Sequence, residues 1–435
     1  MTNGVHIPSW DSAGADRVWT DSSGKERWRS APGQALGIAE VSDEDLWAMR
    51  AAGRRHLVEV ARRLLGMQLQ QRGVDPEGVR GADFVLDPNV LTLGLARRFT
   101  EYKRPNLLLH DMKRLQTLLL DDSHPIQIIV AGKAHPADLP GKAMIRDWIE
   151  LARQPRFRRR VVFLEDYDIA LAQDLVQGVD LWVNTPRRPW EACGTSGMKV
   201  LVNGGLNCSV LDGWWDEAFE PDVGWAIGGP VAGTQEEGDR RDAAELLQRL
   251  ATEIVPEFYD RDAEGLPRAW LQRVRNSMAR LTPAFSSARM LQDYVETAYV
   301  PLSEAVHRRT ADGGAAARAL AAWADGLASH WTGLHMGEPT CSDAAAGRTL
   351  AVSVLLGDVP PIAVRVEAFA DSGPGRLPEI VTLEQDHAIP GATNGYIYAG
   401  SISTARATSD YTVRVVAWHA DALLPAELPL IAWQR

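Results

Sequence analysis

The sequence predicts an α/β protein: a Rossmann-like, doubly wound parallel sheet followed by a smaller β-rich domain. From residue 90 onward, short apolar runs alternate with helical stretches, which is the pattern of a parallel sheet wound with helices. From residue 349 to the end, alternating or continuous apolar segments indicate an antiparallel β-domain. The length of 435 residues and the 45% hydrophobic content allow a substantial core and two or more domains.

The elements are expected in the following order. Residues 42–72 form an amphipathic helix, because Ser42 can cap it and apolar residues recur at helical spacing. Strands follow at 90–95, 126–131, 161–164, 181–183 and 208–211, with helices between them. Residues 242–300 are helical and end near Pro301; Gly313-Gly314 then lead into an Ala-rich helix. Further strands are expected at 350–356, 362–369 and 411–418. The predicted domains are 1–305, a linker and helix at 306–348, and 349–435.

Charge and cysteine content exclude several classes of function. The 46 Lys and Arg residues against 57 Asp and Glu give a net charge of −11, which disfavours non-specific binding to nucleic acid or an anionic membrane. The three cysteines lack the spacing of metal ligands, so no metal site is predicted, and free thiols suit a reducing compartment. No stretch approaches the roughly 18 apolar residues of a membrane span. We therefore expect a cytoplasmic protein.

The most informative segment is WEACGTSGMKVLVNGG, residues 190–205. It places Lys199 just beyond a small-residue turn that opens a predicted helix. Backbone amides at such a turn can approach an anion closely, and a lysine amine can hold a cofactor aldehyde. This one segment could therefore bind both ends of pyridoxal phosphate, although a solvated helix lysine is the alternative.

Four polar segments follow predicted strands: 97–103, 132–135, 165–167 and 190–195. Ligands of open α/β sheets bind at the carboxyl ends of the strands, so these segments are expected to converge on one edge. Within the first segment, the cations Arg97, Arg98 and Lys103 suit two neighbouring phosphates. A solvated basic surface is the alternative interpretation.

In this order and spacing, the four segments resemble those of α-glucan (glycogen or starch) phosphorylases, which are pyridoxal-phosphate glycosyltransferases. The resemblance extends to about Pro301, and residues 409–433 are similar to the tail of some bacterial members. It implies the C-terminal lobe of a two-lobed glycosyltransferase, with pyridoxal 5'-phosphate as cofactor. The implied reaction is attack of inorganic phosphate on a terminal α-1,4-linked glucosyl unit, which releases glucose 1-phosphate with retention. The resemblance also implies that the cofactor phosphate acts as the proton donor and acceptor.

The resemblance also implies roles for individual residues. Lys199 forms the aldimine with the cofactor, and the catalytic Arg98 and Lys103 bind the substrate phosphate. The other implied cofactor-binding residues are Arg97, Thr195, Ser196, Tyr167 and Trp10, and the implied substrate-binding residues are Asn3, Tyr102, Glu191, Cys193 and Gly194.

Two of these positions depart from the family pattern. Position 97 is often lysine, and position 193 is usually serine; a thiol is a poorer hydrogen-bond partner than a hydroxyl. Tyr102, Tyr167 and Trp10 can also be read as packed aromatic residues, and Asn3 as part of a turn.

Three further features suggest function only weakly. Trp214 and Trp215 could stack on carbohydrate, but core or lobe-interface packing is the favoured interpretation. Cys193 has no evident histidine partner that would make it a nucleophile. His135 is a single loop histidine, which alone is a weak sign of acid–base chemistry.

The family's N-terminal lobe supplies a glycine-rich loop and a histidine that contacts the sugar. This chain starts where the second lobe starts, so we expect a truncated or split enzyme that binds its cofactor and is inactive alone. The expected partners are an α-1,4-glucan, inorganic phosphate and a separate N-terminal lobe. Two alternatives are a nucleotide-sugar glycosyltransferase such as a glycogen synthase, which needs no aldimine lysine, and a non-enzymatic glucan-binding half-protein.

Overall fold

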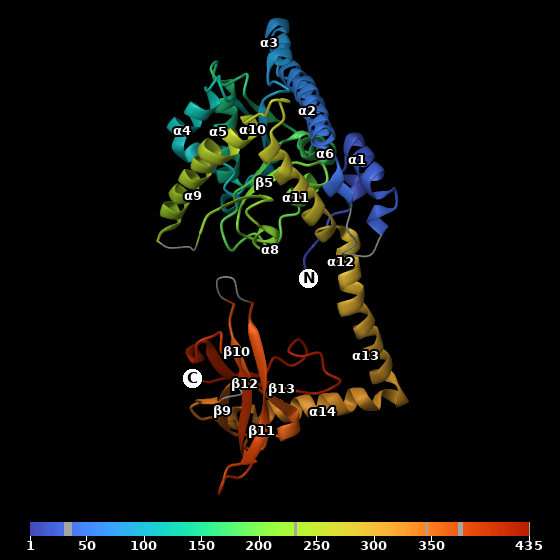
Figure 1. Cartoon of the computed structure of the whole chain (residues 1–435), viewed down its shortest axis with the longest axis vertical. Coiled ribbons are helices and arrows are strands. Elements are labelled where there is room, and N and C mark those ends of the chain that lie inside the picture. The colour runs from blue at the N-terminus through green and yellow to red at the C-terminus, as the bar shows by residue number, and fades with distance from the viewer. Residues whose placement is uncertain (30–36, 230–232, 345–346, 373–376, 435) are drawn as a thin grey trace. The chain divides into compact units, whose positions relative to one another are not determined.

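The computed structural model describes residues 1–29, 37–229, 233–344, 347–372 and 377–434. The chain divides into two compact units, Met1–Glu296 (unit 1) and Thr297–Arg435 (unit 2), and each is described by itself (Figure 1).

Unit 1 is built on a six-stranded parallel sheet. Its strands are β1 (Leu91–Arg98), β2 (Ile126–Lys133), β3 (Val161–Leu164), β4 (Leu181–Asn184), β5 (Leu206–Val210) and β6 (Gly224–Ile227), in the order β3-β2-β1-β4-β5-β6. The prediction for β3 is confirmed to the residue. β1 and β2 run to Arg98 and Lys133, beyond their predicted ends, because the two strands continue to pair in register. β6 was not predicted.

Helices cover both faces of this sheet. Alternate strand residues enter two separate cores: Leu93 and Leu95 belong to one, and Ala96 belongs to the other. Side chains of α2 and α6 pack into the second core, and those of α9 and α11 into the first. The helices are α1 (Ala13–Ser23), α2 (Asp43–Gln71), α3 (Pro76–Arg80), α4 (Met112–Leu119), α5 (Leu139–Arg153), α6 (Ile169–Gly178), α7 (Ser196–Leu201), α8 (Trp214–Ala218), α9 (Gln235–Arg249), α10 (Val255–Tyr259), α11 (Arg268–Ala284) and α12 (Ser287–Tyr294).

The long helix α2 begins as predicted. The Ser42 hydroxyl accepts a hydrogen bond from the Asp45 amide at 3.1 Å, which satisfies one of the unpaired donors at the helix start. Three acidic residues follow in the first turn, where they complement the helix dipole.

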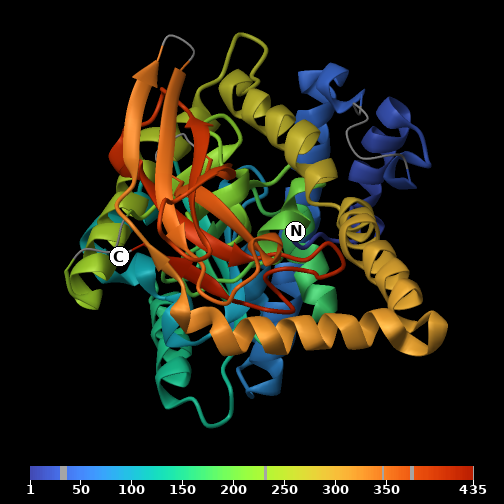
Figure 2. The same cartoon turned by 90° about the horizontal axis from the view of Figure 1, so that it is seen from below.

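Unit 2 contains an antiparallel sheet over its own core (Figure 2). Its helices are α13 (Val300–Thr310) and α14 (Ala315–His330), and its strands are β7 (His335–Met336), β8 (Thr340–Ala344), β9 (Gly347–Leu355), β10 (Val364–Ala370), β11 (Glu379–Ala388), β12 (Gly395–Ile402), β13 (Tyr411–Ala417) and β14 (Ile431–Trp433). The strand order is β14-β13-β10-β11-β12-β9-β7, with β8 paired to β9. The predicted fold class is thus confirmed in both units.

The predicted helix end near Pro301 is wrong. Pro301 lies at the second position of α13, directly after a π-helical turn (Val295–Tyr299), and the helical run continues past it to Thr310. Within the described residues, no helix is both long and apolar enough to cross a membrane.

Candidate functional site

The strand order of unit 1 places a switch point between β1 and β4. From this point the chain winds outward, to β2 and β3 on one side and to β5 and β6 on the other. In open α/β sheets the crevice at such a point is where ligands bind. β1 ends with Arg97 and Arg98, and β4 ends with Asn184 shortly before the 190–195 segment. Two of the four predicted segments therefore meet here.

A cationic pocket of about 480 Å³ opens beside the end of β1. We expected Arg97 and Arg98 to come after the end of the strand, but they occupy its last two positions. Arg98 pairs in register with Lys133 of β2, and both side chains are exposed. The lining residues are Arg97, Arg98, Lys133, Ala134, His135 and Tyr167. Three cationic side chains around one hollow suit an anionic ligand.

Arg97 is held from two sides. Its guanidinium donates to the carbonyl of Lys103 at 2.8 Å and to the side-chain oxygen of Asn184, while its Nε is buried without a partner. Burial lowers the pKa of Arg97 to about 10, although the carboxylate of Glu191 acts in the opposite direction. A buried, charged group with an unpaired N–H is stabilised by a nearby anion.

Lys103 and Glu191 form a half-buried ion pair at 2.5 Å across the switch point. The Glu191 amide donates to the carboxylate of Asp212 at 2.8 Å, which fixes the start of the 191–199 segment. The Lys103 amine lies 4.9 Å from the ring centroid of Tyr102, and the Tyr102 ring is 6.3 Å from that of Trp190. The predicted phosphate-binding lysine and the predicted sugar-binding carboxylate are thus direct neighbours.

Lys199 lies in α7, the short helix that follows the small-residue turn. Its amine is 3.9 Å from the ring centroid of Trp10, and burial lowers its pKa. A lowered pKa leaves more of the amine in the neutral, nucleophilic form at a given pH. The turn is held by Gly194, whose φ of +82° favours glycine, and by Ser196, whose hydroxyl accepts from the indole of Trp182 at 3.3 Å.

The remaining predicted residues have less distinctive surroundings. Cys193 is in hydrogen-bond contact with Asn3, and burial raises the pKa of the thiol, which does not favour a nucleophilic role. Thr195 precedes α7 without capping it through its side chain. Trp214 and Trp215 are buried in the core, so the favoured interpretation of these residues as packed aromatics is confirmed.

Sequence reasoning missed three polar residues that support the site: Asn184, Trp182 and Asn203. The side-chain oxygen of Asn184 accepts a hydrogen bond from Arg97. The indole of Trp182 donates to the Ser196 hydroxyl. The side-chain amide of Asn203 donates to the carbonyl of Trp10. For Asn184 there was a signal, because it is the polar residue that ends the apolar run of β4 at the ligand-binding edge.

Fold and site together define an α/β protein with a doubly wound parallel sheet and a cationic pocket at the carboxyl ends of β1 and β2. Residues 79–220 match the family model for carbohydrate phosphorylase, and residues 331–435 match that for the glycogen phosphorylase C-terminal domain. The chain belongs to the α-glucan phosphorylase family.

Similar proteins of known name support this family assignment. The chain is 38% identical to a glycogen phosphorylase of Mycobacterium bovis, over 99% of this chain and 51% of that protein. It is 40% identical to a glycogen phosphorylase of Aquifex aeolicus, over 69% of this chain and 43% of that protein. It is 32% identical to a maltodextrin phosphorylase of Thermococcus litoralis, over 100% of this chain and 52% of that protein. The chain spans about half the length of the curated relatives it matches.

Proposed function

We propose that this chain forms the pyridoxal-phosphate-binding lobe of a cytoplasmic α-1,4-glucan phosphorylase, which uses inorganic phosphate to release glucose 1-phosphate from terminal glucosyl units. The observation that carries the proposal is that two features lie at or beyond the carboxyl ends of strands of one parallel sheet in a family member. One is the half-buried Lys199 amine against Trp10, and the other is the cationic pocket that contains a buried guanidinium with an unpaired N–H.

The residues present fit the proposed cofactor. An amine whose pKa is lowered by burial suits an aldehyde, and the unpaired Nε of Arg97 suits a phosphate. Lys199 would hold the aldehyde and Trp10 would pack beside it. Arg97, Tyr167, Thr195 and Ser196 would hold the phosphate end. When bound, the cofactor supplies a phosphate group that can donate and accept a proton.

Arg98 and Lys103 are proposed to bind the substrate phosphate. Arg98 is exposed at the end of β1, so its guanidinium is available to an arriving dianion. Lys103 is paired with Glu191, and an arriving phosphate would compete for the same ammonium hydrogens. Binding of phosphate would therefore loosen the Lys103–Glu191 pair and release the carboxylate to accept hydrogen bonds from sugar hydroxyls.

The glucosyl unit is proposed to lie against Asn3, Tyr102, Glu191, Cys193 and Gly194. Asn3 and Cys193 already contact each other, which brings the start of the chain to the 191–195 turn. A Cβ on Gly194 would lie 3.3 Å from the side chain of Glu191, so glycine leaves that carboxylate room to turn. The weak hydrogen bonding of the Cys193 thiol predicts a looser sugar contact there than a serine would make.

Turnover requires a closed cleft in which charges on the reacting groups are stabilised away from water. We assign the cofactor and phosphate contacts to this chain, and the opposing wall to an N-terminal lobe of the kind that the resemblance implies. That lobe, the glucan and inorganic phosphate are the proposed partners.

The first test is an absorbance titration of the purified chain with pyridoxal phosphate. We expect a saturable spectral change in the wild type that is lost in Lys199→Ala and kept in Lys142→Ala, because Lys142 is exposed on α5 outside the site. Equal titrations of all three proteins would refute the cofactor site. The second test measures phosphate-dependent release of glucose 1-phosphate from an α-1,4-glucan, with Lys199→Ala as control.

A further inference from the structure

Three consecutive carbonyl groups near the start of the chain each accept a hydrogen bond from a side-chain amide. Gln173 donates to Ser9 at 2.8 Å, Asn203 donates to Trp10 at 2.8 Å, and Gln177 donates to Asp11 at 3.2 Å. We call these three side chains, Gln173, Gln177 and Asn203, the amide clamp. Two of its members come from α6, and the third follows α7.

Asn203 joins two parts of the site. Its side-chain oxygen accepts from the Ser12 amide at 2.8 Å, so both ends of this amide bind the N-terminal segment. Its nitrogen also lies 3.5 Å from the carbonyl oxygen of Lys199. Asn203 is only 1% exposed, so water cannot replace these bonds readily. One buried side chain therefore ties the backbone of Trp10 to the backbone of Lys199.

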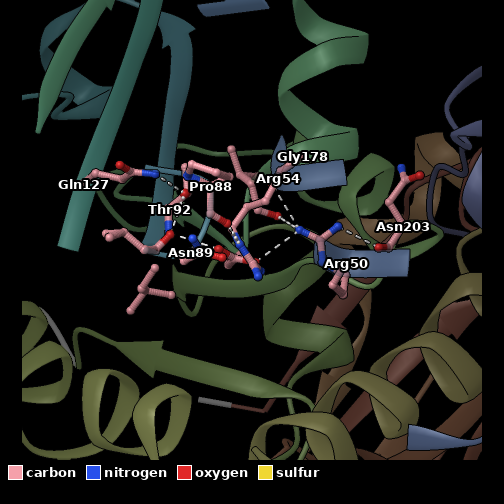
Figure 3. A network of polar contacts seen from close by, with 12 residues as sticks. Arg50, Arg54, Pro88, Asn89, Thr92, Gln127, Gly178 and Asn203 are labelled. Atoms are coloured by element: carbon pink, nitrogen blue, oxygen red, sulfur yellow. Dashed lines mark hydrogen bonds and ion pairs between the residues drawn. The ribbon is translucent and has the colours of Figure 1, made fainter. Parts of the chain in front are cut away.

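Arg50 of α2 anchors the clamp from the interior (Figure 3). Its guanidinium donates to the carbonyl of Gln177 at 3.0 Å and to the carbonyl of Asn203 at 2.8 Å. The side chain is 1% exposed and lies 3.4 Å from the carboxylate of Asp180, which balances its charge. The backbones of two clamp residues, from two different elements, are thus fixed by one rigid planar group.

We infer that the amide clamp holds the Trp10 ring against the Lys199 amine, and that Asn203 is its principal positioning residue. The inference rests on the proposed function, because it assigns the clamp to the preparation of the cofactor lysine. The ring of Trp10 limits the access of water to the amine only while its backbone is held. Releasing the clamp would let the segment move and let water reach Lys199.

The test compares Asn203→Ala with the double variant Gln173→Met/Gln177→Met, which keeps side-chain length but removes two donors from half-buried positions. The control is Gln127→Ala. Gln127 is also buried and hydrogen-bonded, to Thr92 at 2.7 Å and to Asp87 at 2.8 Å, but it makes no contact with the clamp.

Two readouts are used. The first is the dissociation constant of pyridoxal phosphate, which we expect to rise about tenfold in Asn203→Ala. A loss of affinity of this size is what the loss of one buried hydrogen bond, with the resulting rearrangement of the N-terminal segment, would cause. The second needs no cofactor: the pH dependence of Lys199 acylation, read by mass spectrometry with the exposed Lys142 as internal reference. In both clamp variants the titration midpoint of Lys199 should move up, and in Gln127→Ala it should not move.

The outcomes separate the two proposals. A folded clamp variant with the wild-type acylation profile and wild-type affinity would overturn the role of the clamp. Should Asn203→Ala fail to fold, the double variant decides in the same way. If the wild-type chain itself binds no pyridoxal phosphate, the proposed function fails, while the acylation profiles still decide whether the clamp positions Trp10.

Discussion

Replacing Asp180 by asparagine is the sharpest test of what stabilises unit 1. Asp180 is 1% exposed, and its carboxylate lies 2.6 Å from the guanidinium of Arg54 and 3.4 Å from that of Arg50. Its second oxygen accepts from the Thr92 amide at 3.0 Å. The carboxylate thus joins the starts of β1 and β4 to α2, at the amino ends of two strands whose carboxyl ends form the predicted ligand-binding edge.

The expected magnitude follows from burial. Asp180→Asn keeps the shape and an acceptor for the Thr92 amide, but it leaves two buried guanidinium groups without their anion. Removing one partner of a buried ion pair costs about 3–5 kcal/mol, because the remaining charge stays desolvated. The matched control is Asp222→Asn. Asp222 pairs with Arg280 at the surface, and such exposed pairs contribute about 0–1 kcal/mol.

Native-state hydrogen exchange is the suitable assay, because it reports on each unit separately. In Asp180→Asn the amides of β1 and β4 should exchange roughly 10² to 10⁴ times faster, which corresponds to the expected loss of free energy of unfolding. The amides of β13 in unit 2 serve as an internal reference. Exchange in Asp180→Asn that is indistinguishable from that in Asp222→Asn would refute the claim that this network stabilises the sheet.

Three other predictions follow from single residues. Hydrogen bonds from Lys25 and Arg27 lower the pKa of Asp16 from 3.8 to about 2. The contribution of these bonds to the free energy of unfolding is therefore fully present above pH 3.8 and is lost as the pH falls through 2. Acid titrations of unfolding should show that loss in the wild type and not in Asp16→Asn. Burial raises the pKa of Cys208 to about 12, so a thiol reagent should modify the exposed Cys341 first and Cys208 only after unfolding; early reaction of Cys208 would contradict its burial. Gly132→Ala should destabilise unit 1 by more than about 1 kcal/mol in denaturant titrations, because φ is +152° and the new Cβ would collide with a carbonyl of β1. Unchanged stability would show that β1 can move aside.

Local signals explain which elements the sequence predicted well. Ser42 marked the start of α2, because a side-chain cap depends only on residues within one turn. The apolar run of β3 defined its own limits, since it is bounded by charged residues on both sides. The segments at 97–103 and 190–195 could be assigned to one edge of the sheet, because parallel strands place their carboxyl ends together.

Long-range pairing explains what the sequence did not predict. Only the hydrogen bonds to β2 extend β1 through Arg98, and only pairing with β5 turns residues 224–227 into β6. The Lys103–Glu191 pair joins positions 88 residues apart, and the bond of Asn203 to the Trp10 carbonyl joins positions 193 apart. By itself the sequence determined the fold class, the family resemblance and the residue types available for chemistry. The tertiary structure alone decided which of those residues meet, because hydrogen bonds and ion pairs depend on distances that periodicity and spacing along the chain do not encode.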